Sequence, residues 1–237
     1  MCIRDSTRTD INVLKSIFRA AEEHGADYVS IADTVGILNP STASYIVKEI
    51  KKAVKTKVCI HCHNDLGMAV ANTLSGAEAG AFQLHTTVNG IGERCGNASL
   101  EELLVSLRVQ YGIDRYDVSK LMEISKLVEQ YSEIPIHPTK PVVGANAFAH
   151  ESGIHVAAVL ENPMTYELFA PEMVGGKREI IIGKHTGSKA LKGVIEKMGY
   201  HLTHDQMCTL LDKVKKCGEA KKKVTCGRLT EFIRELE

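Results

Sequence analysis

The sequence lacks the features that mark membrane-spanning, secreted and nucleic-acid-binding proteins. It contains no run of about eighteen apolar residues, the length that a helix needs to span a bilayer. No apolar segment follows Met1, so nothing here predicts a secretory signal peptide. Lysine plus arginine number 29 and aspartate plus glutamate also number 29, and this zero net charge gives no electrostatic reason to expect nucleic acid or an anionic membrane as partner. We expect a cytoplasmic protein.

A disulfide framework is not expected. The seven cysteines are odd in number, and Cys59 and Cys62 lie in an apolar, strand-like run. This usage is typical of reduced thiols in a cytosolic protein. Cys59 and Cys62 form a C-x-x-C motif, but no second pair stands at zinc-ribbon spacing, which disfavours a structural zinc site.

Two segments resemble known motifs, but the spacing of their residues differs from each motif by one position. Gly90 and Gly92 are followed by Gly96, one position too late for the G-x-G-x-x-G fingerprint, so NAD binding is not expected. His150 and His155 stand one position too far apart for H-E-x-x-H, and residues five apart on a helix do not share a face. A zinc metalloprotease is therefore excluded. His155 alone remains either a general acid or base or a structural histidine in a glycine-rich loop.

What is present is an alternation of helical and strand-like segments, which predicts an α/β fold of parallel strands with helical crossovers. Asp10 is a predicted N-cap, and capping boxes are predicted at Ser99 with Glu102 and at Thr203 with Gln206. A proline-containing linker is expected over residues 134–140. Helices are predicted over residues 10–24, 39–54, 68–79, 99–109, 118–131, 188–198, 203–216 and 229–236, and strands over 28–31, 58–61 and 82–88.

The predicted strands end in polar segments: IADTVG, IHCHNDLG and TTVNGIGERCGN. The carboxyl ends of parallel strands are where α/β enzymes place their chemistry. His61 and His63 alternate with Cys62 and so point to one face, which makes them candidate ligands of a divalent ion. The glycine-rich loop brings Asn97 beside them as a third candidate. The hydroxyl of Thr34 could bind a substrate carboxylate or cap a turn, and both readings stay open.

Four segments, IADTVG, HCHNDLGMAVAN, TTVNGIGERCGNASLEE and AFAHESGIH, together resemble the isopropylmalate synthase and homocitrate synthase family. The resemblance extends from about residue 7 to the C-terminus. It implies the C-terminal part of a (βα)8 TIM barrel followed by small α-rich C-terminal subdomains. Residues 1–114 would hold the last three to four βα units, and residues 115–237 the linker helix and the subdomains. It also implies a homodimer.

The same resemblance implies a Claisen-type condensation of acetyl-CoA with a 2-oxo acid, assisted by a divalent metal (Zn, Mn or Mg) that polarises the keto group. His61, His63 and Asn97 match the family's metal ligands. Thr34 matches the threonine that holds the oxo-acid carboxylate. His155 and Tyr166 match a pair that the C-terminal subdomain of the partner protomer places over the acetyl group.

The sequence also departs from the family pattern. The Arg-Asp-Gly-Glu/Asp-Gln motif of the family's first strand is missing, and Arg4 stands where an acidic residue usually precedes Asp5. We therefore expect an N-terminally truncated chain that is inactive alone. The small residues after His155 favour homocitrate synthase and 2-oxoglutarate. The alternatives are an isopropylmalate or citramalate synthase, a metal-dependent aldolase or lyase, and an inactive remnant.

Overall fold

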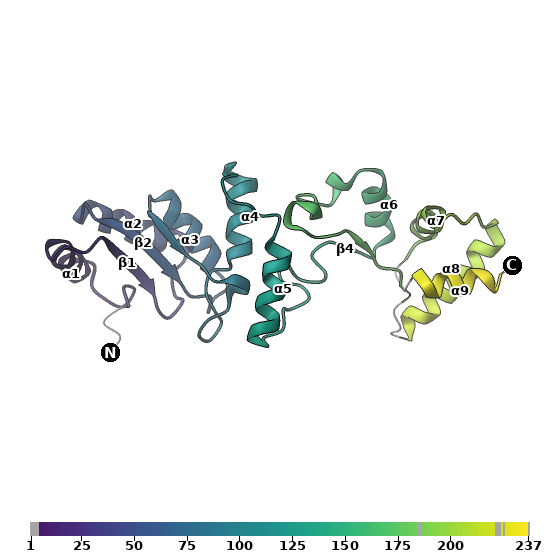
Figure 1. The fold of residues 1–237 in the computed structure, drawn as a ribbon, viewed down its shortest axis with the longest axis horizontal. Helices are drawn as coiled ribbons and strands as arrows, with labels where there is room; N and C mark the ends of the chain where they lie inside the picture. The colour runs from purple at the N-terminus through teal and green to yellow at the C-terminus, as the bar shows by residue number, and fades with distance from the viewer. Residues whose placement is uncertain (1–4, 184–185, 221–223, 225, 237) are drawn as a thin grey trace. The chain divides into compact units, whose positions relative to one another are not determined.

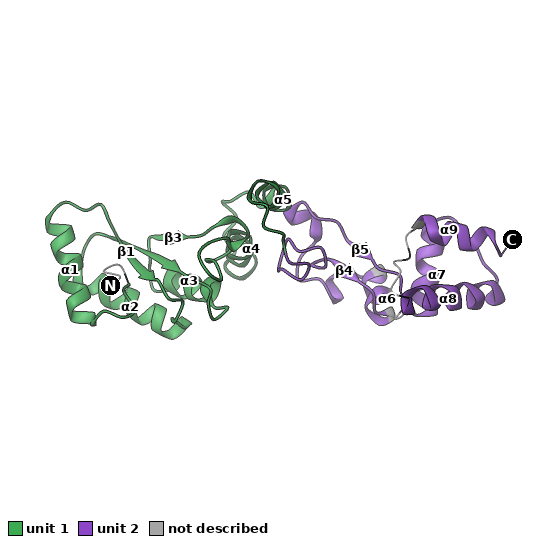
Figure 2. Ribbon diagram, turned by 90° about the horizontal axis from the view of Figure 1, so that it is seen from below, with its two compact units in different colours: residues 1–136 green, residues 137–237 purple. Residues whose placement is uncertain are grey.

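A computed structural model describes residues 5–183, 186–220, 224 and 226–236. The chain divides into two compact units, residues 1–136 (unit 1) and residues 137–237 (unit 2), which Figure 2 colours separately. The departure from the family pattern at Arg4 lies outside the described residues. Among those that are described, no helix has both the length and the apolar character that crossing a membrane requires.

Unit 1 is built around a three-stranded parallel sheet in the order β1-β2-β3. Figure 1 labels the neighbouring strands β1 and β2 of this sheet. Each strand follows a helix or precedes one, as the sequence predicts for βα units. The elements in chain order are α1 (Ile11–Glu23), β1 (Tyr28–Asp33), α2 (Pro40–Ala53), β2 (Lys57–Cys62), α3 (Ala69–Glu78), β3 (Gln83–His85), the 3-10 turn η1 (Val88–Gly90), α4 (Leu100–Tyr111) and α5 (Leu121–Ser132).

The two faces of this sheet differ in burial. One face packs against α1, α2 and α3 and forms the core of unit 1, with side chains such as Ile31 and Ile60 fully buried. The opposite face carries the buried Cys59 together with Ser30, Ala32, His61 and His85, none of which is buried. Because the register pairs Ala32 with His61 and His61 with His85, these last three residues lie at one level across the sheet.

Two capping predictions concern helices of unit 1, one at α1 and one at α4. The Asp10 side chain accepts hydrogen bonds from the first-turn amides of α1, which confirms the predicted N-cap. The capping box predicted at Ser99 is wrong, because the Ser99 side chain makes no capping hydrogen bond. Its hydroxyl instead donates to the buried carboxylate of Glu101, 2.6 Å away.

Unit 2 contains a two-stranded parallel sheet and a separate helical core. The capping box at Thr203 and Gln206 is confirmed at the start of α8. One helix, α6, was not predicted from the sequence. The elements are β4 (Ala149–His150), α6 (Gly153–Glu161), the 3-10 turns η2 (Pro163–Thr165) and η3 (Pro171–Val174), β5 (Glu179–Ile180), α7 (Ser188–Lys197), α8 (His204–Glu219) and α9 (Cys226–Arg234).

Helix α5 lies within unit 1. The reason is a pair of hydrogen bonds between α5 and the turn η1. The Asn89 side chain donates to the Ser125 carbonyl at 2.9 Å, and the Ser125 hydroxyl donates back to the Asn89 carboxamide. The expected domain division at residues 114 and 115 stays a prediction.

Candidate active site

Two histidines converge at the carboxyl end of β2. The Nε2 atoms of His61 and His63 lie 3.3 Å apart, and their rings meet edge to face with centroids 5.0 Å apart. This follows from strand alternation, since Cys62 between them points into the core. The structure therefore brings both predicted ligands to one point on the open face of the sheet.

Asn97 is held directly beside His63. The two residues form an antiparallel bridge in which the amide of Asn64 donates to the Gly96 carbonyl at 2.9 Å. The amide of Ala98 donates to the Cys62 carbonyl at 3.2 Å. These two hydrogen bonds thus hold Asn97 next to His63, although 34 positions separate the two residues in the sequence.

The side chain of Asn97 presents an unused acceptor. Its Nδ2 donates to the Ile91 carbonyl at 3.2 Å, and Gly92 lies so close that a Cβ there would press on the carboxamide. Its Oδ1 is buried without a hydrogen-bond partner, and so is Nδ1 of His63. Buried polar atoms are rarely left unpaired, so an orphaned oxygen on the residue that bridges to His63 calls for a ligand.

Electrostatics favour a neutral imidazole at this point. Burial lowers the pKa of His61, and the neighbouring His63 and His85 lower it further. A neutral ring keeps the lone pair that metal coordination needs. Within the described residues no group of three histidine, cysteine or carboxylate side chains gathers around a common point. The cluster of two histidines and one carboxamide is therefore the candidate ligand set.

The loop after β1 carries Thr34, which is half-buried. Its carbonyl accepts a hydrogen bond of 2.6 Å from the Nη2 atom of Arg94. Asp33, just before it, points to the buried side, and its carboxylate accepts from the amides of Ile37 and Leu38. Burial raises the pKa of Asp33, and these amides oppose that shift.

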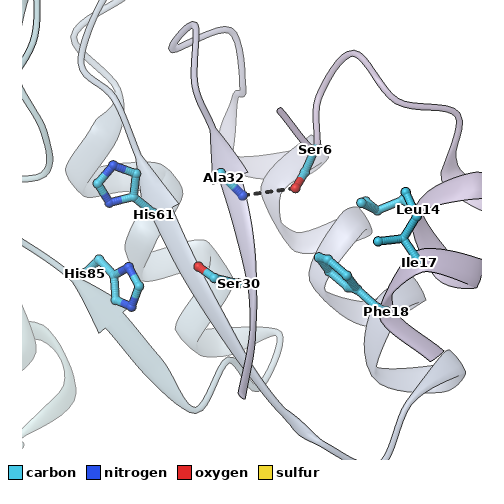
Figure 3. A pocket seen from close by; sticks show the side chains of 8 residues that line it. All are labelled: Ser6, Leu14, Ile17, Phe18, Ser30, Ala32, His61 and His85. Atoms are coloured by element: carbon cyan, nitrogen blue, oxygen red, sulfur yellow. Dashed lines mark hydrogen bonds between the residues drawn. The ribbon is translucent and has the colours of Figure 1, made fainter. Parts of the chain in front are cut away.

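A pocket of about 400 Å³ opens on the uncovered face of the sheet beside this cluster. Figure 3 shows His61 and His85 on one side of β1 and the apolar side chains of α1 on the other. Ser6 is tied to β1, since its hydroxyl accepts from the Ala32 amide at 3.0 Å. The lining residues are Ser6, Leu14, Ile17, Phe18, Ser30, Ala32, His61 and His85.

His85 was not among the site residues predicted from the sequence. The signal was available, because His85 faces the same side of the sheet as His61 and stands opposite it in the register. Its ring centroid lies 5.7 Å from that of His61.

In unit 2 the structure brings His155 and Tyr166 together. His155 lies in α6, Tyr166 follows η2, and their rings stack with centroids 4.0 Å apart and planes 28° apart. Both residues are exposed. Next to Tyr166, the buried carboxylate of Glu167 accepts from Arg178 at 2.5 Å and lies 3.3 Å from Nε2 of His150. This ion pair anchors the segment that carries Tyr166.

Comparison with protein families decides the affiliation. The profile of the family described as HMGL-like matches residues 1–128. The chain belongs to the HMGL-like family. A second profile, described as homocitrate synthase post-HMGL domain-like, matches residues 142–222. The resemblance read from the four sequence segments is thereby confirmed.

Similar proteins extend beyond this chain. It is 62% identical over 234 residues to homocitrate synthase AksA of Methanosarcina acetivorans, covering 98% of the chain and 58% of that protein. It is 46% identical over 233 residues to (R)-citramalate synthase CimA of Methanocaldococcus jannaschii, covering 98% of the chain and 48% of that protein. The chain thus spans about half the length of the relatives it matches.

Among solved structures, hydroxymethylglutaryl-CoA lyase of Pseudomonas aeruginosa superposes with a TM-score of 0.51 at 19% identity, covering 57% of this chain and 48% of that one. At this identity the likeness concerns the fold alone. It confirms the predicted α/β class and the relation of this chain to a TIM barrel.

Proposed function

We propose that this chain is part of an acyltransferase that condenses acetyl-CoA with a 2-oxo acid, and that the oxo acid is 2-oxoglutarate, as in homocitrate synthases. The higher identity to a homocitrate synthase than to a citramalate synthase supports this substrate. The match of residues 142–222 to the homocitrate synthase post-HMGL domain supports a synthase over a metal-dependent aldolase or lyase. The observation that carries the proposal is the convergence of His61, His63 and Asn97.

These residues fit a divalent cation. Two nitrogens that each lie about 2.1 Å from one ion are separated by roughly 3.0 to 3.4 Å for octahedral to tetrahedral angles. The observed Nε2 separation is 3.3 Å, and Asn97, paired with His63 across the bridge, offers its unpaired Oδ1 as an oxygen ligand. We assign Zn²⁺, Mn²⁺ or Mg²⁺ to His61, His63 and Asn97. Such an ion, when bound, polarises the keto carbonyl as a Lewis acid.

The chain's own residues supply binding and proton transfer. Thr34 binds the carboxylate of the oxo acid through its hydroxyl at the strand end. His155 removes a proton from the acetyl methyl group as general base, and Tyr166, stacked on it, orients the ring. The resulting enolate attacks the keto carbon, and the keto oxygen takes up a proton to become a hydroxyl group. Water then hydrolyses the thioester to release CoA and leave the carboxylate. We propose that the protein is a homodimer in which His155 and Tyr166 act in the active site of the partner protomer. We also place the protein in the cytoplasm.

The test uses a chimera in which this chain replaces the aligned segment of the Methanosarcina acetivorans relative, to which it is 62% identical. Thiol release from acetyl-CoA is followed with 2-oxoglutarate and with the oxo acids of isopropylmalate and citramalate synthases. We expect turnover that depends on a divalent metal, is highest with 2-oxoglutarate and is lost in His61→Ala. Preference for another oxo acid would overturn the substrate, and metal-independent turnover would overturn the site.

A parallel assay on the 237-residue chain tests the expectation that it is inactive alone. Within its described part the candidate ligand set contains no carboxylate. We expect no thiol release above the background of a heat-denatured sample. Robust turnover by the chain itself would contradict this expectation and would show that the three ligands suffice.

A further inference from the structure

One side chain, that of Arg94, joins the three loops that follow the three strands of unit 1. Its Nε and Nη2 atoms donate to the two carboxylate oxygens of Asp65 at 2.7 and 2.9 Å. Nη2 also donates to the carbonyl of Thr34 at 2.6 Å. These contacts span 29 and 60 positions in the sequence, so Arg94 connects segments that the chain itself keeps apart.

The backbone around this contact is unusual. Arg94 adopts a left-handed backbone conformation with φ of +55°. Residues other than glycine avoid this conformation unless their surroundings impose it. Gly36, in the loop after β1, has φ of +66° and no room for a side chain, because a Cβ there would lie 2.5 Å from Oδ2 of Asp65. The loop that holds Gly36 and the loop that holds Arg94 therefore both contact the Asp65 carboxylate.

Stability of the fold does not account for this arrangement. The Arg94 side chain is 44% exposed and that of Asp65 is 22% exposed. Ion pairs this open to water contribute little to the stability of a folded protein. A planar guanidinium that binds a carboxylate through two hydrogen bonds nevertheless fixes direction and register, which a single point charge does not.

The positions of these contacts indicate what they hold in place. Asp65 lies two residues after His63, and Arg94 lies three residues before Asn97. The third contact is the backbone of Thr34 itself. The same guanidinium thus sets the spacing between the loops that bear two of the proposed metal ligands and the proposed carboxylate-binding threonine.

We propose that Arg94 and Asp65 are positioning residues that clamp the three loops and so hold Asn97, His63 and Thr34 in place for the metal and the oxo acid. The metal part of this inference rests on the proposed function. The clamp itself rests on the contacts of Arg94.

The first test measures Co²⁺ binding to the 237-residue chain by visible absorption. Removal of residues that support metal ligands costs about 10- to 100-fold in affinity, and because Arg94 acts one step further out we expect about tenfold for Arg94→Ala. Asp65→Ala is expected to match it, and the double variant should be no worse than either, since the pair acts as one unit. Arg94→Lys keeps the positive charge but lacks the planar guanidinium that makes two parallel hydrogen bonds, so it should restore little of the Co²⁺ affinity.

Arg115→Ala is the matched control, because the exposed Arg115 side chain donates to its own neighbour Tyr116. It should bind Co²⁺ like the unaltered chain. The urea midpoint of unfolding should be the same for Arg94→Ala and Arg115→Ala, which separates a positioning role from a loss of fold.

A second measurement needs no metal. The amides of Asn64 and Ala98 bridge the two loops, and their hydrogen exchange reports whether those loops stay together. We expect faster exchange at both amides in Arg94→Ala and unchanged exchange in His61→Ala. If the unaltered chain binds no Co²⁺, the metal assignment fails and exchange alone decides the clamp. Exchange and Co²⁺ affinity both unchanged in Arg94→Ala would overturn it.

Discussion

Adding a single methyl group at Gly92 should displace Asn97 without removing it. A Cβ on Gly92 would lie 3.0 Å from Cγ of Asn97 and closer still to its Nδ2. Gly92 does not have a left-handed backbone and is exposed, so alanine meets no strain there except this side chain. The carboxamide must turn away, and it loses its hydrogen bond to the Ile91 carbonyl. The stability cost is about 1 kcal/mol.

The cost to metal binding should be larger than the cost to stability. If Oδ1 of Asn97 is a ligand, its displacement should weaken Co²⁺ binding by at least the roughly 10- to 100-fold seen for supporting residues, or about 1.4 to 2.7 kcal/mol. The assay is a Co²⁺ titration of Gly92→Ala, Asn97→Ala and the double variant. In Asn97→Ala the carboxamide is already absent, so adding Gly92→Ala should not lower the Co²⁺ affinity further. Unaltered affinity in Gly92→Ala, or additive losses in the double variant, would refute the reasoning.

Three further predictions concern unit 1. The buried carboxylate of Glu101 accepts hydrogen bonds from the partly buried Asn89 amide and the buried Ser99 hydroxyl. Glu101→Ala removes this acceptor and should destabilise the unit by roughly 2 to 5 kcal/mol in urea-dependent hydrogen exchange, whereas Glu123→Ala, at an exposed position, should not. Burial raises the pKa of Cys62 to about 12, so iodoacetamide at pH 8 should label the exposed Cys95 well before Cys62, as peptide mass spectrometry would show. Burial and the neighbouring His63 and His85 lower the pKa of His61 from its usual 6.5 in the folded chain. The contribution of His61 to the free energy of unfolding should therefore be complete above pH 6.5 and be lost as the pH falls through the lowered pKa of the folded state. His61→Gln should reduce this loss of stability in acid in the metal-free chain, and an unchanged dependence of stability on pH would contradict a lowered pKa.

Much of the local structure could be predicted because its causes are local. Asp10 caps α1 and Thr203 caps α8 through hydrogen bonds that reach only two or three residues along the chain. At Ser99 the same rule failed, because the buried carboxylate of Glu101 accepts the hydroxyl in place of a backbone amide. Helix α6 was missed because its sequence is apolar on most sides and shows little periodicity.

The candidate site divides in the same way. That His61 and His63 share a face follows from strand alternation over three residues. That Asn97 lies beside His63 required the further assumption that neighbouring strand ends meet, which the bridge between them bears out. Nothing in the motif indicated that Gly92 makes room for the Asn97 carboxamide or that its Oδ1 lacks a partner.

The amino-acid sequence alone therefore determined the α/β class, the family and the pairing of the two imidazoles, since these depend on short-range periodicity and on motifs whose order is legible along the chain. Only the tertiary structure decided which distant groups meet: Arg94 with Thr34 across 60 positions, and His85 opposite His61. The physical reason is that hydrogen-bond register and side-chain packing between remote segments depend on all of them at once, and no single segment encodes them.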